Sequence, residues 1–305
     1  MHEEMIGQVR SFNRTVTQHV GALNEEFLAR HRPLGQARLL WEIASDGAGT
    51  DVRQLRSRLD LDSGYLSKLL RSLEADGLVV VERSEADGRV RTAHLTASGA
   101  AERAELDRRS DEAACSILGP LSGPQRTRLV AAMAEVERLL TASAIRVITA
   151  DPQDRAARAA MAAYFGELAR RFERGFNPAL SISADDTELR PPAGLLLLAT
   201  LRAEPVGIGA LKFHADGPAE VKRMWVAPTV RGMGLGRRLL AELEARAAER
   251  GVVTLRLETN QALREAISLY RSAGYREVAA FYDEAYAHHW FEKGIGEVWP
   301  SALDG

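Results

Sequence analysis

The chain has 305 residues, of which 46% are hydrophobic and 27% are charged, a balance typical of folded globular proteins and not of disordered ones. This length predicts two domains. The formal net charge of −2 excludes a uniformly basic nucleic-acid coat, although a local basic surface could still bind DNA. The single cysteine, Cys115, excludes an intramolecular disulfide and a cysteine-rich zinc site. We expect Cys115 to be buried in a helix, and we predict no metal site.

Nothing in the sequence indicates a membrane or a secretory protein. The longest apolar run, residues 195–199, is far shorter than the roughly 20 residues that span a bilayer and is typical of a buried strand. The start, Met1-His2-Glu3-Glu4, lacks the basic and apolar segments of a secretory signal. We therefore expect a cytoplasmic protein with no membrane partner.

The first part of the chain, residues 1–143, has mostly helical periodicity. Apolar residues recur every three or four positions from Val9 to Phe27, which predicts one long helix. Two shorter helices follow, one before the turn at residues 46–49 and one capped by Asp51.

A third short helix and a hairpin come next. The helix follows Asp62 and turns its leucines inward, at positions Leu66, Leu69, Leu70 and Leu73. Strand-like stretches at residues 78–83 and 89–95 flank the turn Glu85-Ala86-Asp87-Gly88, because Asp-Gly favours positive φ. Two long helices, interrupted at about residues 119–124, complete a winged helix-turn-helix domain over residues 1–143.

The outer face of the helix after Asp62 carries the polar and basic side chains that a recognition helix needs in a major groove. An arginine near the hairpin tip could enter the adjacent minor groove. The side chains expected to contact DNA are Ser63, Tyr65, Ser67, Lys68, Arg71, Arg83 and Arg89. A solvated helix face without this function is the alternative.

From Leu34 to Gly99 the chain resembles the MarR family of bacterial regulators. Three segments carry the resemblance: residues 73–79 (Leu-Glu-Ala-Asp-Gly-Leu-Val), Asp87-Gly88-Arg89, and residues 94–99 (His-Leu-Thr-Ala-Ser-Gly). The resemblance extends over about residues 5–143 and implies a homodimer on double-stranded DNA with a pseudo-palindromic operator. It also implies that Asp87 orients Arg89 on the DNA. Acidic residues interleave with the basic ones, so we expect modest, salt-dependent affinity.

The second part, residues 144–305, alternates strands and helices, which predicts a domain with a mixed sheet flanked by helices. The whole chain is thus a multidomain α/β protein, mainly helical at the N-terminal end and α+β at the C-terminal end. The expected elements are a strand at 145–149, a helix at 152–172, strands at 194–201, 206–213 and 219–226, a helix at 234–250, a strand at 252–258, a helix at 262–273, and strands at 276–280 and 289–293.

A glycine-rich segment, Arg231-Gly232-Met233-Gly234-Leu235-Gly236-Arg237, lies between a predicted strand and a predicted helix. Glycines let backbone N–H groups approach a pyrophosphate, and a helix N-terminus adds a favourable dipole. A dinucleotide fingerprint fits poorly because no acidic ribose partner follows at the usual distance, and no Gly-Lys-Ser/Thr indicates an ATP loop. A glycine-rich turn without a ligand is the alternative.

Residues 145–295 resemble GNAT-type N-acetyltransferases, whose Arg-x-x-Gly-x-Gly motif matches Arg231, Gly234 and Gly236. The resemblance implies a GNAT fold, acetyl-CoA as cosubstrate, and a small-molecule or protein amine as acceptor. It also implies that Tyr270 protonates the leaving thiolate. The residues expected at acetyl-CoA are Met224, Trp225, Val226, Arg231, Gly232, Met233, Gly234, Leu235, Gly236, Arg237 and Asn260. The role of Asn260 stays open, because the asparagine that several branches carry nearer the tyrosine is Leu263 here.

Acetyl transfer to an amine needs a base, because the attacking amine must be neutral. By strand alternation Glu220 shares a face with Lys222, Met224 and Val226, and its spacing matches the glutamate base of one GNAT branch. Glu258 ends the next strand and matches the base of another branch. We favour Glu220, with Glu258 or a water chain as alternatives.

The two resemblances together predict a bifunctional transcriptional regulator and acetyl-CoA-dependent N-acetyltransferase. Two alternatives remain: a regulator whose GNAT domain only senses acetyl-CoA or a ligand, and an enzyme whose N-terminal domain only dimerises. Four aromatic residues could shape an acceptor pocket or belong to the core: Trp225, Tyr282, Tyr286 and Trp290.

Overall fold

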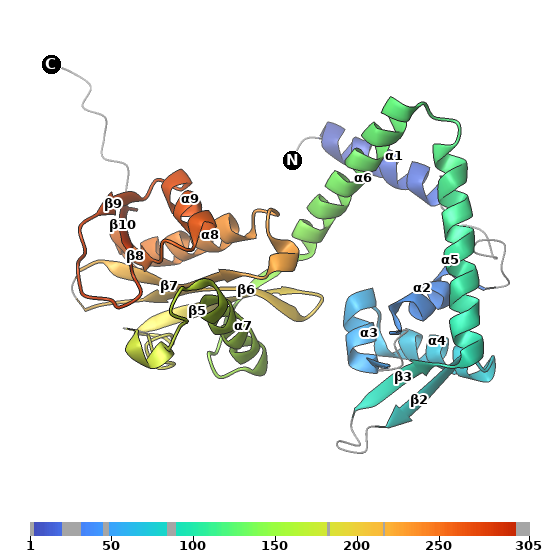
Figure 1. The fold of residues 1–305 in the computed structure, drawn as a ribbon, viewed down its shortest axis with the longest axis horizontal. Coiled ribbons are helices and arrows are strands. Elements are labelled where there is room, and N and C mark those ends of the chain that lie inside the picture. Colours follow the sequence, from blue (N-terminus) through green and yellow to red (C-terminus); the bar gives the residue numbers. More distant parts are fainter. Residues whose placement is uncertain are drawn as a thin grey trace. The chain divides into compact units, whose positions relative to one another are not determined.

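The computed structural model describes residues 3–19, 32–44, 49–83, 90–181, 184–215 and 217–296. The chain divides into two compact units, Met1–Ala132 and Met133–Gly305 (Figure 1). The division falls inside helix α6 (Gly123–Ala144), ahead of the boundary at residue 143 that the sequence predicts. No helix in the described ranges is long and apolar enough to cross a membrane.

The first unit combines helices with a small antiparallel sheet of strand order β1-β3-β2, which confirms the winged helix-turn-helix. The helices that precede α6 are α1 (Glu3–His19), α2 (Leu34–Glu42), α3 (Val52–Leu59), α4 (Ser63–Ala75) and α5 (Ala97–Leu118). The strands are β1 (Thr50–Asp51), β2 (Val79–Arg83) and β3 (Arg91–Leu95). Strand β1 is absent from the sequence analysis, since two residues carry no periodic pattern.

Side-chain caps and a leucine face explain the central helices of this unit. The Asp51 carboxylate accepts from the Arg53 backbone N–H at 2.7 Å, as predicted, and the Asp62 carboxylate accepts from that of Tyr65 at 2.8 Å. All four leucines expected to face inward on α4 are buried. The hairpin tip lies outside the described residues, and so do Asp87 and Arg89.

The prediction that Cys115 is buried is wrong: the residue is exposed on α5. Only Gly99 and Leu106 of α5 are buried, so its later turns contribute nothing to the core of the described unit. Helices α1 and α6 have no buried residue at all among those described. The exposed large apolar side chains on these two helices are Met5, Ile6, Val9, Phe12, Val16, Val130, Met133, Leu139 and Leu140.

The second unit is built on a seven-stranded sheet of order β4-β5-β6-β7-β8-β10-β9. Its strands are β4 (Arg146–Ala150), β5 (Gly194–Leu201), β6 (Glu204–Lys212), β7 (Ala219–Val226), β8 (Thr254–Thr259), β9 (Arg276–Val278) and β10 (His289–Gly294). Helix α7 (Arg155–Arg171) lies on one face of the sheet, and α8 (Leu235–Ala248) and α9 (Arg264–Ser272) lie on the other (Figure 1). The predicted mixed sheet with flanking helices is confirmed.

The sheet opens between its central strands β7 and β8. These strands run parallel, whereas the other neighbouring pairs run antiparallel. They pair only at their first residues, Ala219 with Leu255 and Glu220 with Arg256. Beyond this point the backbone edges of both strands face an opening instead of each other.

A bulge in β7 lies beside this opening. Arg223 and Met224 together stand opposite Gly209 of β6, and Arg223 has a φ of +59°, in the left-handed region. A Cβ at Gly209 would lie 2.8 Å from the Met224 sulfur, so a side chain there would displace Met224. The strict alternation that placed Glu220 and Val226 on one face is therefore interrupted between them.

Candidate functional site

Two adjoining cavities occupy the opening between β7 and β8. Both are lined by Tyr164, Met224 and Tyr270, so they meet at these residues. We call the one that extends over residues 230–237 the loop cavity, and the one that extends to Glu258 the carboxylate cavity. Tyr164 comes from α7, which the sequence analysis did not connect with the site.

The loop cavity ends on the glycine-rich segment. Gly232 and Gly234 have φ values of +76° and +81°, which a side chain would oppose, and α8 begins directly after them. Gly236 serves packing, because a Cβ there would lie 3.3 Å from Leu269 of α9. The predicted cofactor residues that line this cavity are Met224, Trp225, Val226, Arg231, Gly232, Gly234, Leu235, Gly236 and Arg237. Met233 does not, and packs against the core instead.

A buried carboxylate, Glu167 of α7, fixes the arginine of this segment. The Arg231 guanidinium donates to both Glu167 oxygens at 2.5 and 2.6 Å, and the Trp225 indole N–H donates to the same carboxylate at 2.9 Å. Arg171 donates to it at 3.1 Å. Burial alone raises the pKa of Glu167, but these donors outweigh burial and hold its pKa below the ordinary value. Glu167 thereby anchors the loop to α7.

Tyr270 stands where the two cavities meet. The residue is 5% exposed and extends from α9. In the described part of the chain its hydroxyl makes no hydrogen bond, so it is available to a bound molecule. Burial, with the nearby Tyr164 and Glu258, raises the pKa of Tyr270 above the ordinary tyrosine value, so the hydroxyl is protonated at neutral pH. Burial likewise raises the pKa of Tyr164 to about 12.

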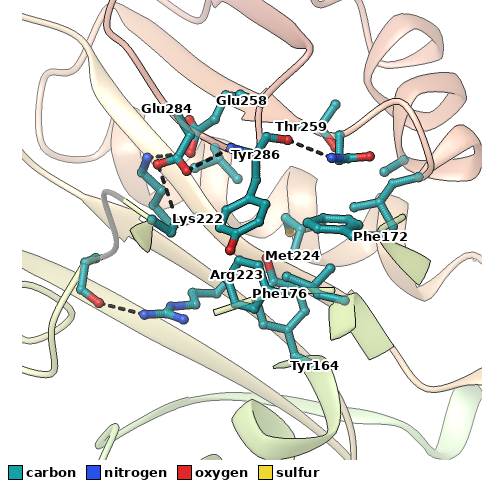
Figure 2. Close-up of a pocket in the computed structure, with 18 of the residues that line it drawn as sticks. Tyr164, Phe172, Phe176, Lys222, Arg223, Met224, Glu258, Thr259, Glu284 and Tyr286 are labelled. Carbon is teal, nitrogen blue, oxygen red and sulfur yellow. Dashed lines mark hydrogen bonds and ion pairs between the residues drawn. The ribbon is translucent and has the colours of Figure 1, made fainter. Parts of the chain in front are cut away.

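The carboxylate cavity holds a polar chain centred on Lys222, which is 8% exposed (Figure 2). The Lys222 ammonium lies 2.7 Å from Glu258, 2.9 Å from Glu220 and 2.6 Å from the Tyr282 hydroxyl. That hydroxyl also donates to Glu258 at 2.6 Å. On the far side, Glu220 lies 3.0 Å from the His214 imidazole.

The two predicted candidate bases thus occupy different places. Glu258 lines the cavity, whereas Glu220 contacts it only through Lys222. Burial opposes the charge on Glu220, but Lys222 and His214 outweigh it and hold the pKa of Glu220 below its usual range.

Asn260 lines the carboxylate cavity, but its side-chain amide is hydrogen-bonded to the backbone. Its NH₂ donates to the Tyr286 carbonyl at 2.7 Å, and its oxygen accepts from the Ala262 N–H at 2.9 Å. Of the four aromatic residues considered for an acceptor pocket, Tyr286 lines this cavity and Trp225 lines the loop cavity. The Tyr282 hydroxyl accepts from Lys222, and Trp290 lines neither cavity.

The predicted DNA-contacting residues that the structure describes lie mainly at the surface. Ser63, Tyr65, Lys68 and Arg71 of α4 are exposed, as is Arg83 at the end of β2. Ser67 is half-buried, and its carbonyl accepts from the Arg71 side chain at 3.2 Å. The structure thus brings the α4 residues together on one accessible helix.

Comparison with known families agrees with both halves. Residues 161–275 match the acetyltransferase (GNAT) family, and residues 32–90 match the MarR family. The chain is a MarR–GNAT fusion. Over 94 residues it is 39% identical to an IAA acetyltransferase of Azospirillum brasilense, and the alignment covers 30% of this chain and 61% of that protein.

Two solved structures are similar to parts of the MarR–GNAT chain. One, from Klebsiella pneumoniae, is assigned as an acyl-CoA N-acyltransferase and is 30% identical, with 50% of this chain and 97% of that chain covered and a TM-score of 0.41. The other is the PcaV transcriptional regulator of Streptomyces coelicolor, at 20% identity, with 45% and 92% covered and a TM-score of 0.35.

Replacing Gly234 with valine is expected to weaken acetyl-CoA binding by the GNAT domain while leaving it folded. A Cβ at Gly234 meets no atom within 4 Å, but holding valine at its φ of +81° costs about 1–2 kcal/mol, so the loop should relax away from this conformation and Kd for acetyl-CoA should rise about tenfold. Gly251→Val is the matched control, since Gly251 has a φ of +78° and equal space but lies outside both cavities. Calorimetric titration with acetyl-CoA measures the effect. Wild-type affinity in folded Gly234→Val protein would contradict the assignment of the loop.

Proposed function

We propose that the GNAT domain is an N-acetyltransferase that transfers acetyl from acetyl-CoA to an amine. One observation carries the proposal: Tyr270, with an available hydroxyl, stands between a cavity that ends on a glycine-rich helix N-terminus and one that ends on Glu258. The loop N–H groups would hold the pyrophosphate of acetyl-CoA. The backbone edge of β7 that β8 leaves unpaired would hold the pantetheine arm.

The reaction follows from this placement. A neutral amine in the carboxylate cavity attacks the thioester carbonyl, a C–N bond forms, and the C–S bond breaks. The proton lost by the amine passes to a base, and the Tyr270 hydroxyl protonates the leaving thiolate. Glu258 acts at the amine because it lines the cavity, and Glu220 acts through Lys222.

An acetyl-CoA consumption assay with purified full-length protein tests this function. Free thiol is measured while small amines, peptides and a lysine-rich protein are supplied in turn. Amine-dependent thiol release supports the enzyme. Acetyl-CoA that binds without any acceptor-dependent release would instead support a sensor domain attached to the regulator.

For the MarR domain we propose sequence-specific binding to double-stranded DNA as a homodimer, in the cytoplasm. The exposed side chains of α4 support the DNA contact, and the apolar residues left exposed on α1 and α6 support a dimer that would cover them. Two recognition helices related by a two-fold axis imply a pseudo-palindromic operator with half-sites about one helical turn apart.

Arg89→Ala is expected to weaken operator binding and to flatten the dependence of log K on log[salt] by about one phosphate contact. Asp87→Ala should act in the same direction by releasing the orientation of Arg89. The measurement is a salt titration on duplexes selected from random sequence. Arg246→Ala removes an arginine of the GNAT domain and serves as control. Equal binding by wild type and both wing variants would contradict the DNA assignment.

A further inference from the structure

Aromatic rings form one wall of the carboxylate cavity (Figure 2). The rings of Phe176 and Tyr286 lie 4.9 Å apart, and each lies 5.8 Å from that of Phe172. The wall is fixed in place, because the Asn177 backbone N–H donates to the Tyr286 hydroxyl at 3.0 Å and Asn260 holds the Tyr286 carbonyl. Rings fixed in this way present a preformed apolar surface to a planar ligand.

Carboxylates lie elsewhere in the lining of the same cavity. Besides Glu258, Glu284 lines it and is 6% exposed, where it accepts from the Ser181 hydroxyl at 3.2 Å. A buried carboxylate beside aromatic rings favours a cation and disfavours a second anion.

Two cationic side chains are among the described residues that line the cavity, and protein groups already bind both. Lys222 contacts Glu258 and Glu220. Arg223 donates to the Ala184 carbonyl at 2.8 Å, and its guanidinium lies 4.6 Å from the centre of the Phe165 ring. Lys222 therefore offsets the charge of Glu258, and neither Lys222 nor Arg223 is left to bind a carboxylate on the acceptor.

We propose that the acceptor is an arylalkylamine, that is, a molecule with one primary amine, an aromatic ring and no carboxylate. Its ring packs against Phe172, Phe176 and Tyr286, and its ammonium group points to Glu258 beside Tyr270. Loss of the ammonium proton exposes the nitrogen to the thioester carbonyl. This inference rests on the proposed acetyltransferase function and adds its substrate class.

Four acceptors test the proposal, and three of them depart from the proposed class. Initial rates of thiol release are measured with phenethylamine, hexylamine (no ring), phenylalanine (an added carboxylate) and spermidine (no ring and two added amino groups). We expect kcat/KM for phenethylamine to exceed each of the others at least tenfold. A kcat/KM for hexylamine, phenylalanine or spermidine equal to or above that for phenethylamine would overturn it.

Two variants connect the preference to the aromatic wall. Phe176→Leu should raise KM for phenethylamine about tenfold and change KM for hexylamine much less. Phe213→Leu is the matched control, because this ring stacks on Arg250 at 4.5 Å and does not line the cavity. An equal effect of both variants would contradict the role of the wall.

Direct binding separates this inference from the proposed function. Calorimetry measures the affinity of phenethylamine and of phenylalanine for the protein with CoA present, without turnover. Preferential binding of phenethylamine supports the acceptor class even if acetyl transfer fails. Transfer to another amine, with no binding of phenethylamine, would support the acetyltransferase function and contradict the arylalkylamine class of acceptor.

Discussion

Tyr270→Phe is expected to lower kcat by about 10²–10⁴-fold while KM for acetyl-CoA changes little, the range for loss of a proton-transfer group. The ring lies among buried residues and remains in the variant, so only the hydroxyl between the two cavities is lost. Without it the thiolate of CoA must leave unprotonated or take its proton from water. Steady-state kinetics with a good acceptor measure the change.

Tyr275→Phe is the matched control for this variant. Tyr275 is buried next to Tyr270, with ring centres 6.0 Å apart, but lines neither cavity. Because this hydroxyl reaches neither cavity, its loss should leave kcat close to that of the wild type. Similar rates for Tyr270→Phe and wild type would remove Tyr270 from the chemistry.

The raised pKa of Tyr270 also fixes the basic side of the pH profile. Burial moves it above the ordinary tyrosine value near 10, so the hydroxyl keeps its proton throughout the usual assay range. In wild type, kcat should therefore show no fall attributable to Tyr270 between about pH 7 and 10, whereas a tyrosine with the ordinary pKa would be half ionised near pH 10. A descending limb in that range that disappears in Tyr270→Phe would contradict the buried, protonated tyrosine.

The sequence predicts the parts of this protein that local patterns determine. An apolar run locates β5 and a preceding turn locates β7, both at the bounds that the structure has. Helical periodicity locates the leucine face of α4. The spacing of Arg231, Gly234 and Gly236 locates the loop cavity, because positive φ and close approach at a helix N-terminus require those glycines.

The sequence does not predict the partners that come from distant elements. Glu167 and Tyr164 lie on α7, more than 50 residues before the loop that they contact or border, and only the packing of α7 brings them there. The one available signal is a glutamate at helical spacing among apolar residues of a predicted helix. The bulge at Arg223 cannot be predicted from the sequence either, since a non-glycine residue with positive φ does not change the pattern of a strand.

That bulge and the opening of the sheet also separate Glu220 from the cavity that Glu258 lines. Strand alternation treats Glu220 and Met224 as neighbours on one face, whereas the cavity begins only where β7 leaves β8, beyond Glu220. The choice between Glu220 and Glu258 depends on this three-dimensional separation, and paired variants address it.

Glu258→Gln is expected to lower kcat by about 10²–10⁴-fold, and Glu220→Gln by a smaller factor, about tenfold. Glutamine keeps the shape of each side chain but cannot take a proton. Glu292→Gln, which affects a β10 glutamate paired with Arg256 at 2.7 Å outside both cavities, is the control. A larger loss in Glu220→Gln would return the role of base to Glu220, and normal rates in both variants would assign it to water.

The pH dependence of the free energy of unfolding then tests the structural role of Glu220 separately from its role in catalysis. Its pKa is lower in the folded protein than in the unfolded chain, so its charge stabilises the fold above about pH 4.3, and this contribution is lost as the pH falls through the lowered folded value. Glutamine lacks the contribution at every pH. Urea unfolding should therefore show Glu220→Gln less stable than wild type at pH 7, with the two free energies of unfolding converging below about pH 4. A difference that stays constant to low pH would mean that the ion pair with Lys222 does not stabilise the fold.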